Sequence, residues 1–153
     1  GMNDECIDIV KEAGLLHDIG KIGIQEDILN KPGKLTAEEY EIMKTHVENS
    51  IGIIRHLPSL DYVIPAVIGH HERYDGKGYP RRIAGEDIPL MARILCIADS
   101  FDAMISVRSY KASMPVERAF AILEEEAGKQ FDPKLVPVFI NLVKSGTIKI
   151  AEG

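Results

Sequence analysis

The sequence has no long apolar run, few cysteines and no excess of basic residues. No stretch approaches the ~20 apolar residues that a helix needs to cross a bilayer, and no secretory leader pattern stands at its start. With 18 basic and 24 acidic side chains the net charge is −6, so no surplus of Lys and Arg is available to neutralise DNA or RNA. Cys6 and Cys96 stand apart, without a CxxC pair. These absences exclude a general nucleic-acid binder and a disulfide scaffold, and we expect a cytoplasmic protein without a transmembrane segment.

The patterns that are present are helical. A chain of 153 residues with 45% hydrophobic residues suits one compact domain. Apolar residues recur at helical spacing from Asn3 to Leu16 and along the stripe of Tyr40, Met43 and Val47. We expect further helices over about 60–70, 90–105, 115–126 and 132–143. The sequence therefore predicts an all-α bundle.

Several residues predict where these helices begin and end. Gly20 is expected to end the first helix in the left-handed conformation. Thr36 and Glu39 form a capping-box pattern for the second helix, which Pro58 is expected to close. In the third helical stretch Pro65 either introduces a kink or marks a later start. Asp132-Pro133 is typical of the first positions of a helix.

Residues 72–88 break the helical pattern. Glycines and prolines cluster in this short span, which predicts a structured loop with a small hairpin around Gly85.

Histidines and aspartates concentrate at helix junctions and within apolar stripes. A single histidine near a core is more often a satisfied hydrogen-bonding group than a metal ligand, and His56, near a helix end, is expected at the surface. Four buried histidines and two aspartates in one small core, however, would be costly without a compensating cation. The set comprises His17, Asp18, His46, His70, His71 and Asp99.

Imidazole and carboxylate ligands without thiolate favour first-row ions such as Fe, Mn, Ni or Zn over a structural Cys-rich zinc site. Adjacent residues on a helix diverge by ~100°, so His17 can bind one ion while Asp18 bridges to a second. Two ions ~3.5–4 Å apart could activate a water and stabilise a phosphoryl-transfer transition state.

Basic residues near these positions have two interpretations. Lys21, four residues after His17, could meet a substrate phosphate as a point charge, or it could be an ordinary solvated lysine. Arg108, Tyr110 and Lys111 could bind phosphate or a base, or they could form a charged surface patch.

Long motifs in the chain closely resemble the HD-GYP family of metal-dependent phosphodiesterases, an HD-superfamily group that hydrolyses cyclic di-GMP. The similarity spans nearly the whole chain after Glu12. The motifs are Leu16-His17-Asp18-Ile19-Gly20-Lys21, Lys31-Pro32-Gly33-Lys34-Leu35, His70-His71-Glu72-Arg73-Tyr74-Asp75-Gly76-Lys77-Gly78-Tyr79-Pro80, Ile97-Ala98-Asp99 and Phe131-Asp132-Pro133.

The resemblance implies a role for each matching residue. It implies that the six histidines and aspartates listed earlier are the ligands of two or three divalent ions. Fe or Mn is the expected metal, with Ni, Zn or Mg as alternatives. Asp18 is expected to bridge ions, and Lys21 to assist the bridging hydroxide or the scissile phosphate. Arg108 and Lys111 are expected to contact substrate. The loop of Asp75, Gly76, Gly78, Tyr79 and Pro80 is expected near the active site, where it is also suspected of binding diguanylate cyclase (GGDEF) domains.

Two departures from the family pattern stand out. The family's domain begins with a further helix that supplies another metal-binding histidine, and residues 1–16 contain no histidine. Gly1 resembles a tag remnant, so we expect residues 1–153 to form a single HD-GYP-like domain without that first helix, with partial metal occupancy, low activity and a tendency to dimerise. The family's Asp-Arg-Pro-Tyr run is Val107-Arg108-Ser109-Tyr110 here.

The expected function is hydrolysis of cyclic di-GMP to pGpG or GMP, as the output domain of a signalling protein with an upstream receiver or sensor domain. Two alternatives stay open. One is an HD hydrolase of another nucleotide, such as a cyclic GMP-AMP dinucleotide. The other is an inactive module that binds a cyclase or the dinucleotide without turnover.

Overall fold

The helices expected from the apolar spacing are present in the computed structural model, which describes residues 4–106 and 113–150. Within those residues the α-helices are α1 (Asp4–Leu16), α2 (Glu26–Leu29), α3 (Ala37–Ile54), α4 (Ile64–Gly69), α5 (Leu90–Ile105), α6 (Val116–Glu125) and α7 (Leu135–Lys144). Short 3₁₀ helices are η1 (Ile19–Gly23), η2 (Pro58–Val63) and η3 (Gly85–Asp87). The described residues form no strand, which confirms the all-α prediction. None of these helices is both long and apolar enough to cross a membrane.

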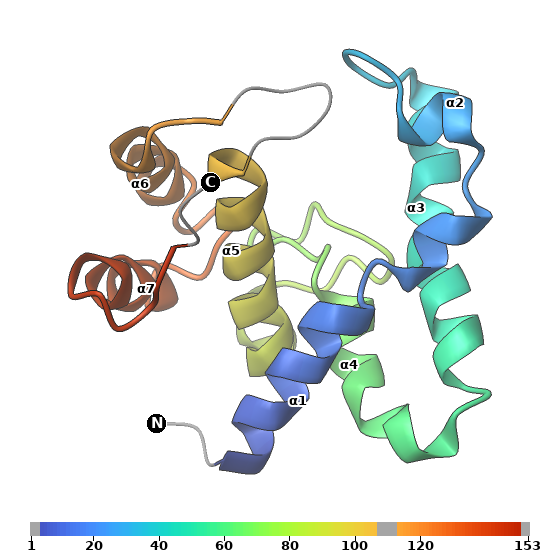
Figure 1. Cartoon of the computed structure of the whole chain (residues 1–153), viewed down its shortest axis with the longest axis horizontal. Coiled ribbons are helices and arrows are strands. Elements are labelled where there is room, and N and C mark those ends of the chain that lie inside the picture. Colours follow the sequence, from blue (N-terminus) through green and yellow to red (C-terminus); the bar gives the residue numbers. More distant parts are fainter. Residues whose placement is uncertain (1–3, 107–112, 151–153) are drawn as a thin grey trace.

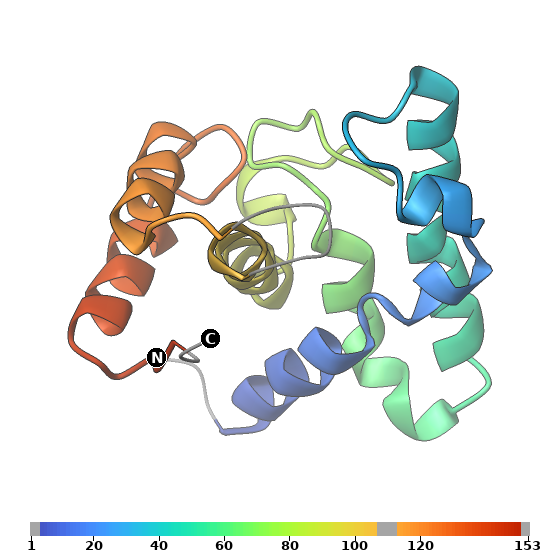
Figure 2. The same ribbon diagram turned by 45° about the horizontal axis from the view of Figure 1, so that its top comes forward.

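Helix α5 runs through the middle of the molecule and contacts helices on both sides (Figures 1 and 2). On one side α6 and α7 pack against it, and on the other side lie α1 and α4, with α3 beyond α4. The first group buries an apolar cluster of Cys96, Ile97, Phe101, Met104, Ala119, Phe120, Leu123, Phe131, Val136, Ile140 and Val143. The second buries a smaller cluster of Ala13, Ile54, Val63, Ala66, Val67 and Leu95.

The turn after α1 differs from the sequence prediction. Gly20 does not adopt the left-handed conformation, but lies buried inside η1. A Cβ on Gly20 would lie 2.0 Å from the carbonyl oxygen of His46 and 2.4 Å from the amide nitrogen of Ser50. Glycine is therefore required here because η1 packs directly on the backbone of α3, not because a helix has to be terminated.

Helix α3 begins as the sequence predicts. The Thr36 hydroxyl accepts from the Glu39 amide at 3.2 Å, and the Glu39 carboxylate accepts from the Thr36 amide at 2.7 Å. The helix ends at Ile54, before Pro58, which instead lies in η2. The third predicted helix is divided into η2 and α4, and Pro65 stands in the first turn of α4, so the later start is the correct alternative.

Two further expectations are corrected in the second half of the chain. No hairpin forms around Gly85, which instead has φ +59° and opens the 3₁₀ turn η3. Helix α7 begins at Leu135 rather than at Pro133. Asp132 still shapes the approach to this helix, because its carboxylate accepts from the Lys134 amide and its carbonyl accepts from the Val136 amide.

Candidate metal centre and active site

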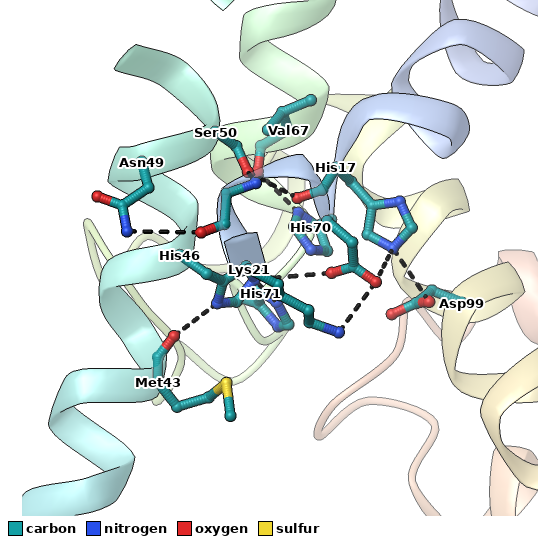
Figure 3. Close-up of polar contacts among 12 residues, drawn as sticks. His17, Lys21, Met43, His46, Asn49, Ser50, Val67, His70, His71 and Asp99 are labelled. Atoms are coloured by element: carbon teal, nitrogen blue, oxygen red, sulfur yellow. Dashed lines mark hydrogen bonds and ion pairs between the residues drawn. The ribbon is translucent and has the colours of Figure 1, made fainter. Parts of the chain in front are cut away.

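The six predicted ligand residues come from α3, α5 and the turns that directly follow α1 and α4. Figure 3 shows His17, His46, His70, His71 and Asp99 converging on one region. Their ligand atoms form two groups, and within each group all atoms lie within 4.8 Å of one another. The groups are His46 with His70 and His71, and His17 with Asp18 and His70. Asp99, on α5, joins the second group through its carboxylate, which lies 3.2 Å from His17 Nε2. His70 belongs to both groups, so the arrangement offers adjacent positions for two cations.

Three of the histidines are oriented by their own helices. Nδ1 of His17 donates to the carbonyl of Gly14 at 2.7 Å, Nδ1 of His46 donates to Met43 at 2.6 Å, and Nδ1 of His70 donates to Val67 at 2.7 Å. Each acceptor stands three residues earlier in the chain. These bonds fix the Nδ1 proton and direct Nε2 towards the shared centre, as outer-shell carbonyls do for metal-binding histidines.

The nitrogen atoms at the centre lack enough partners within the protein. Nε2 of His70 is buried and has no hydrogen-bond partner. Nε2 of His71 lies 3.0 Å from Nε2 of His46, so one of these two nitrogens must carry a proton, which a bound metal would displace. A buried polar atom without a partner is costly, and a divalent cation would satisfy these lone pairs together. Imidazole and carboxylate donors in this arrangement therefore fit a first-row divalent metal.

The carboxylate side of the cluster is strongly charged. His17 Nε2 lies 3.2 Å from Asp18 Oδ2, and Lys21 Nζ lies 3.0 Å from the same oxygen. Burial alone would lower the pKa of His17, but its hydrogen bonds to Asp18 and Asp99 outweigh burial and raise that pKa to about 10. Burial would likewise raise the pKa of Asp18, but His17 and Lys21 hold it well below its usual range.

The imidazole side has the opposite character. Burial, together with the positive charge on His17, lowers the pKa of His70 to about 4. Burial and the adjacent imidazoles of His70 and His46 lower the pKa of His71 to about 2. Burial lowers the pKa of His46 as well. These three side chains are therefore neutral near pH 7, the form in which imidazole binds a metal.

Ser50 supports the site, although no sequence motif marks it. Its hydroxyl accepts from the Gly20 amide at 2.8 Å and donates to the His17 carbonyl at 3.1 Å. It thereby ties α3 to the backbone on both sides of Asp18. Ser50 lies one helical turn after His46 on the buried face of α3, which is a weak sequence signal for a role near the site. A lone serine in an apolar stripe does not indicate which group it bonds to.

The predicted loop lies beside the centre, as expected. Asp75 accepts two hydrogen bonds from Arg73 and one from the Lys77 amide. A Cβ on Gly78 would lie 2.4 Å from the Arg73 amide nitrogen, so only glycine allows the chain to fold back here. This tight turn brings the Tyr79 ring onto the His71 ring, with centroids 4.8 Å apart and planes 15° apart.

A cavity of about 360 Å³ opens next to the loop and the histidines. Its lining combines metal-ligand candidates, basic residues and aromatic rings: Tyr40, His70, His71, Glu72, Arg73, Lys77, Gly78, Tyr79, Cys96, Asp99, Ser100, Ala103 and Gln130. The cavity offers room for a phosphate-bearing ligand beside the ligand cluster, and Lys77 and Arg73 in its lining are cationic groups that a phosphate could meet. Arg108 and Lys111 lie outside the described residues, and His56 is exposed, as the sequence predicts.

A helical bundle whose paired His17 and Asp18 meet histidines from neighbouring helices defines an HD-type domain. The comparison with protein families agrees: the HD domain matches residues 1–135, and the chain belongs to this family. The recognition drawn from the sequence motifs is thereby confirmed.

Individual relatives are similar over most of the chain. A cyclic di-GMP phosphodiesterase of Thermotoga maritima is 44% identical over 149 residues, which cover 96% of this chain and 40% of that protein. A 3′3′-cGAMP-specific phosphodiesterase of Vibrio cholerae is 43% identical over 144 residues, covering 92% of this chain and 27% of the relative. A crystal structure of a cyclic GMP-AMP specific phosphodiesterase of V. cholerae shares the fold, with a TM-score of 0.71 at 23% identity, over 95% of this chain and 40% of that one. The chain therefore spans less than half the length of these proteins.

Proposed function

We propose that this domain is a metal-dependent phosphodiesterase that hydrolyses cyclic di-GMP to pGpG or GMP. The observation that carries the proposal is the convergence of four histidines and two aspartates beside a cavity lined with basic residues. A pure binding surface has no chemical need for a buried imidazole that lacks a partner. The substrate class follows from the relatives, one of which, at 44% identity, is named a cyclic di-GMP phosphodiesterase.

Each residue of the cluster has a proposed task. His17, Asp18, His46, His70, His71 and Asp99 would hold two or three divalent ions. The imidazole and carboxylate donors favour a first-row ion, and the resemblance to the HD-GYP family favours Fe or Mn among these. When bound, such ions supply an activated water and offset charge on a phosphoryl group. Asp18, shared between His17 and Lys21, would bridge ion positions. Lys21 presents an ammonium group 3.0 Å from Asp18, where it can meet a phosphate oxygen.

A second candidate substrate is the mixed dinucleotide 3′3′-cGAMP. It is favoured by the relative of 43% identity that is named specific for that molecule. Both dinucleotides share the phosphate chemistry and differ only in one base, so the same cluster serves either one. Binding of diguanylate cyclase domains and the presence of an upstream receiver or sensor domain stay predictions from the resemblance.

The deciding experiment is incubation of the purified chain with cyclic di-GMP or 3′3′-cGAMP, each with Mn(II) or Fe(II), followed by chromatography of the products. Asp18→Ala should reduce turnover more than about 100-fold, because the residue proposed to bridge the ions is lost. His56→Ala, an exposed histidine outside the cluster, is the matched control and should keep wild-type turnover. Tight binding of dinucleotide with no product from the wild type would support the inactive module instead.

A further inference from the structure

Tyr40 departs from the place that its sequence pattern predicts. It continues the apolar stripe of α3 with Val47, Ile51 and Ile54, which are all buried. Tyr40, by contrast, is 47% exposed and lines the cavity beside the histidine cluster. A large aromatic ring left open at the mouth of a cavity retains apolar surface that a ligand could cover.

The surroundings of Tyr40 hold its ring in place, with the Lys44 ammonium over the ring, and leave nearly half of the residue exposed. The ring of Tyr79 meets it edge to face, with centroids 6.1 Å apart, and Tyr79 in turn stacks on His71. The ammonium group of Lys44 lies 5.5 Å from the Tyr40 ring and 5.7 Å from the Tyr79 ring. A continuous row of rings therefore leads from a metal-ligand candidate, His71, to an exposed aromatic at the rim of the cavity.

We propose that Tyr40 is a stacking platform for a purine base of the dinucleotide whose phosphate lies at the histidine and aspartate cluster. This inference rests on the proposed function and adds the residue that receives the base. A base is joined to its phosphate through one ribose, so it must lie beside the phosphate site rather than on it. Tyr40 is separated from His71 by a single ring, and a half-exposed tyrosine offers the flat face on which a purine stacks.

The test compares two probes that share a sugar phosphate and differ in the base. Dissociation constants of GMP and ribose 5-phosphate are measured by calorimetry on the Mn(II)-loaded chain. Tyr40→Ala should weaken GMP binding about tenfold, since loss of one base–aromatic stack is of that size. Its affinity for ribose 5-phosphate should stay unchanged. Tyr40→Phe keeps the ring and should restore GMP binding. For cyclic di-GMP, Tyr40→Ala should raise KM and leave kcat unchanged.

Tyr62→Ala is the matched control, because Tyr62 is 43% exposed and bonds to Glu12 far from this cavity. The platform is overturned if Tyr40→Ala binds GMP as tightly as the wild type, or if it loses both probes to the same extent. Hydrolysis of cyclic di-GMP by the wild type is followed in parallel. A wild-type chain that stacks GMP on Tyr40 but cuts no dinucleotide supports the platform and contradicts the proposed function alone.

Discussion

The two sides of α5 bury different kinds of side chain. Towards α6 and α7, α5 buries an apolar cluster whose members include Phe101, Leu123 and Ile140. Towards α1, α3 and α4, the apolar cluster is smaller, and the buried side chains include His46, His70 and Ser50. The first side gains free energy by removing carbon from water. The second side contains polar atoms whose partners are incomplete, and His70 Nε2 is the clearest case.

This contrast assigns fold stability to one side of the domain and cation binding to the other. The apolar side can stabilise the fold in the absence of any ligand, whereas the polar side accepts an energetic cost that a cation would relieve. Ile97 and Asp99 both lie on α5, yet Asp99 faces His17 while Ile97 belongs to the apolar cluster. Stability and metal binding should therefore be separable by mutation.

The largest expected effect on stability comes from the apolar side. Leu123 is fully buried in the cluster of α5, α6 and α7. Leu123→Ala should lower the free energy of unfolding by about 3 kcal/mol, because it removes buried carbon and leaves a cavity. Denaturant titration measures this loss. Affinity for Mn(II) should remain within about twofold, since distant sites act independently. An equal loss of Mn(II) affinity would show that the two sides are not separable.

The next effect concerns the polar side. Mn(II) at 100 times its dissociation constant should stabilise the wild-type chain by about 2.7 kcal/mol, and a chelator should reverse the gain. His70→Ala should abolish this stabilisation because His70 belongs to both ligand groups. Thermal unfolding with and without Mn(II) measures it, and His56→Ala should respond as the wild type does. A full Mn(II) response in His70→Ala would contradict the proposed centre.

The smallest effect lies at the start of α3, away from both sides. The side chain of Lys31, together with the Thr36 amide, lowers the pKa of Glu39 below its usual value of 4.5. A carboxylate with a depressed pKa stabilises the folded state above the unfolded pKa, and that contribution is lost as the pH falls through the folded pKa. Glu39→Gln keeps the capping geometry but removes the charge. Its stability should fall slightly below wild type at pH 7, and this difference should shrink as the pH falls below 4.5; a difference that does not change with pH would refute the charge effect.

Much of the fold could be predicted because its signals are local. The capping box at Thr36 and the apolar spacing of α1, α3 and α5 are properties of neighbouring residues, and the structure confirms them. The predictions that failed depend on distant contacts. The local pattern predicts a helix stop at Gly20, whereas glycine is needed there for close packing on the backbone of His46, a segment far along the chain. Gly85 does lie in a turn, but its local sequence does not distinguish the expected hairpin from the 3₁₀ turn η3 that forms.

For the candidate site too, local sequence predicts some features and only the tertiary structure decides others. Residue types and motifs predict the ligand set of His17, Asp18, His46, His70, His71 and Asp99. Only the tertiary structure decided that their ligand atoms meet, that Ser50 ties α3 to the turn after His17, and that Tyr40 stands open at the cavity. The reason is physical: helix periodicity and caps act over a few residues, whereas convergence depends on how separate helices pack against one another, which no local pattern encodes.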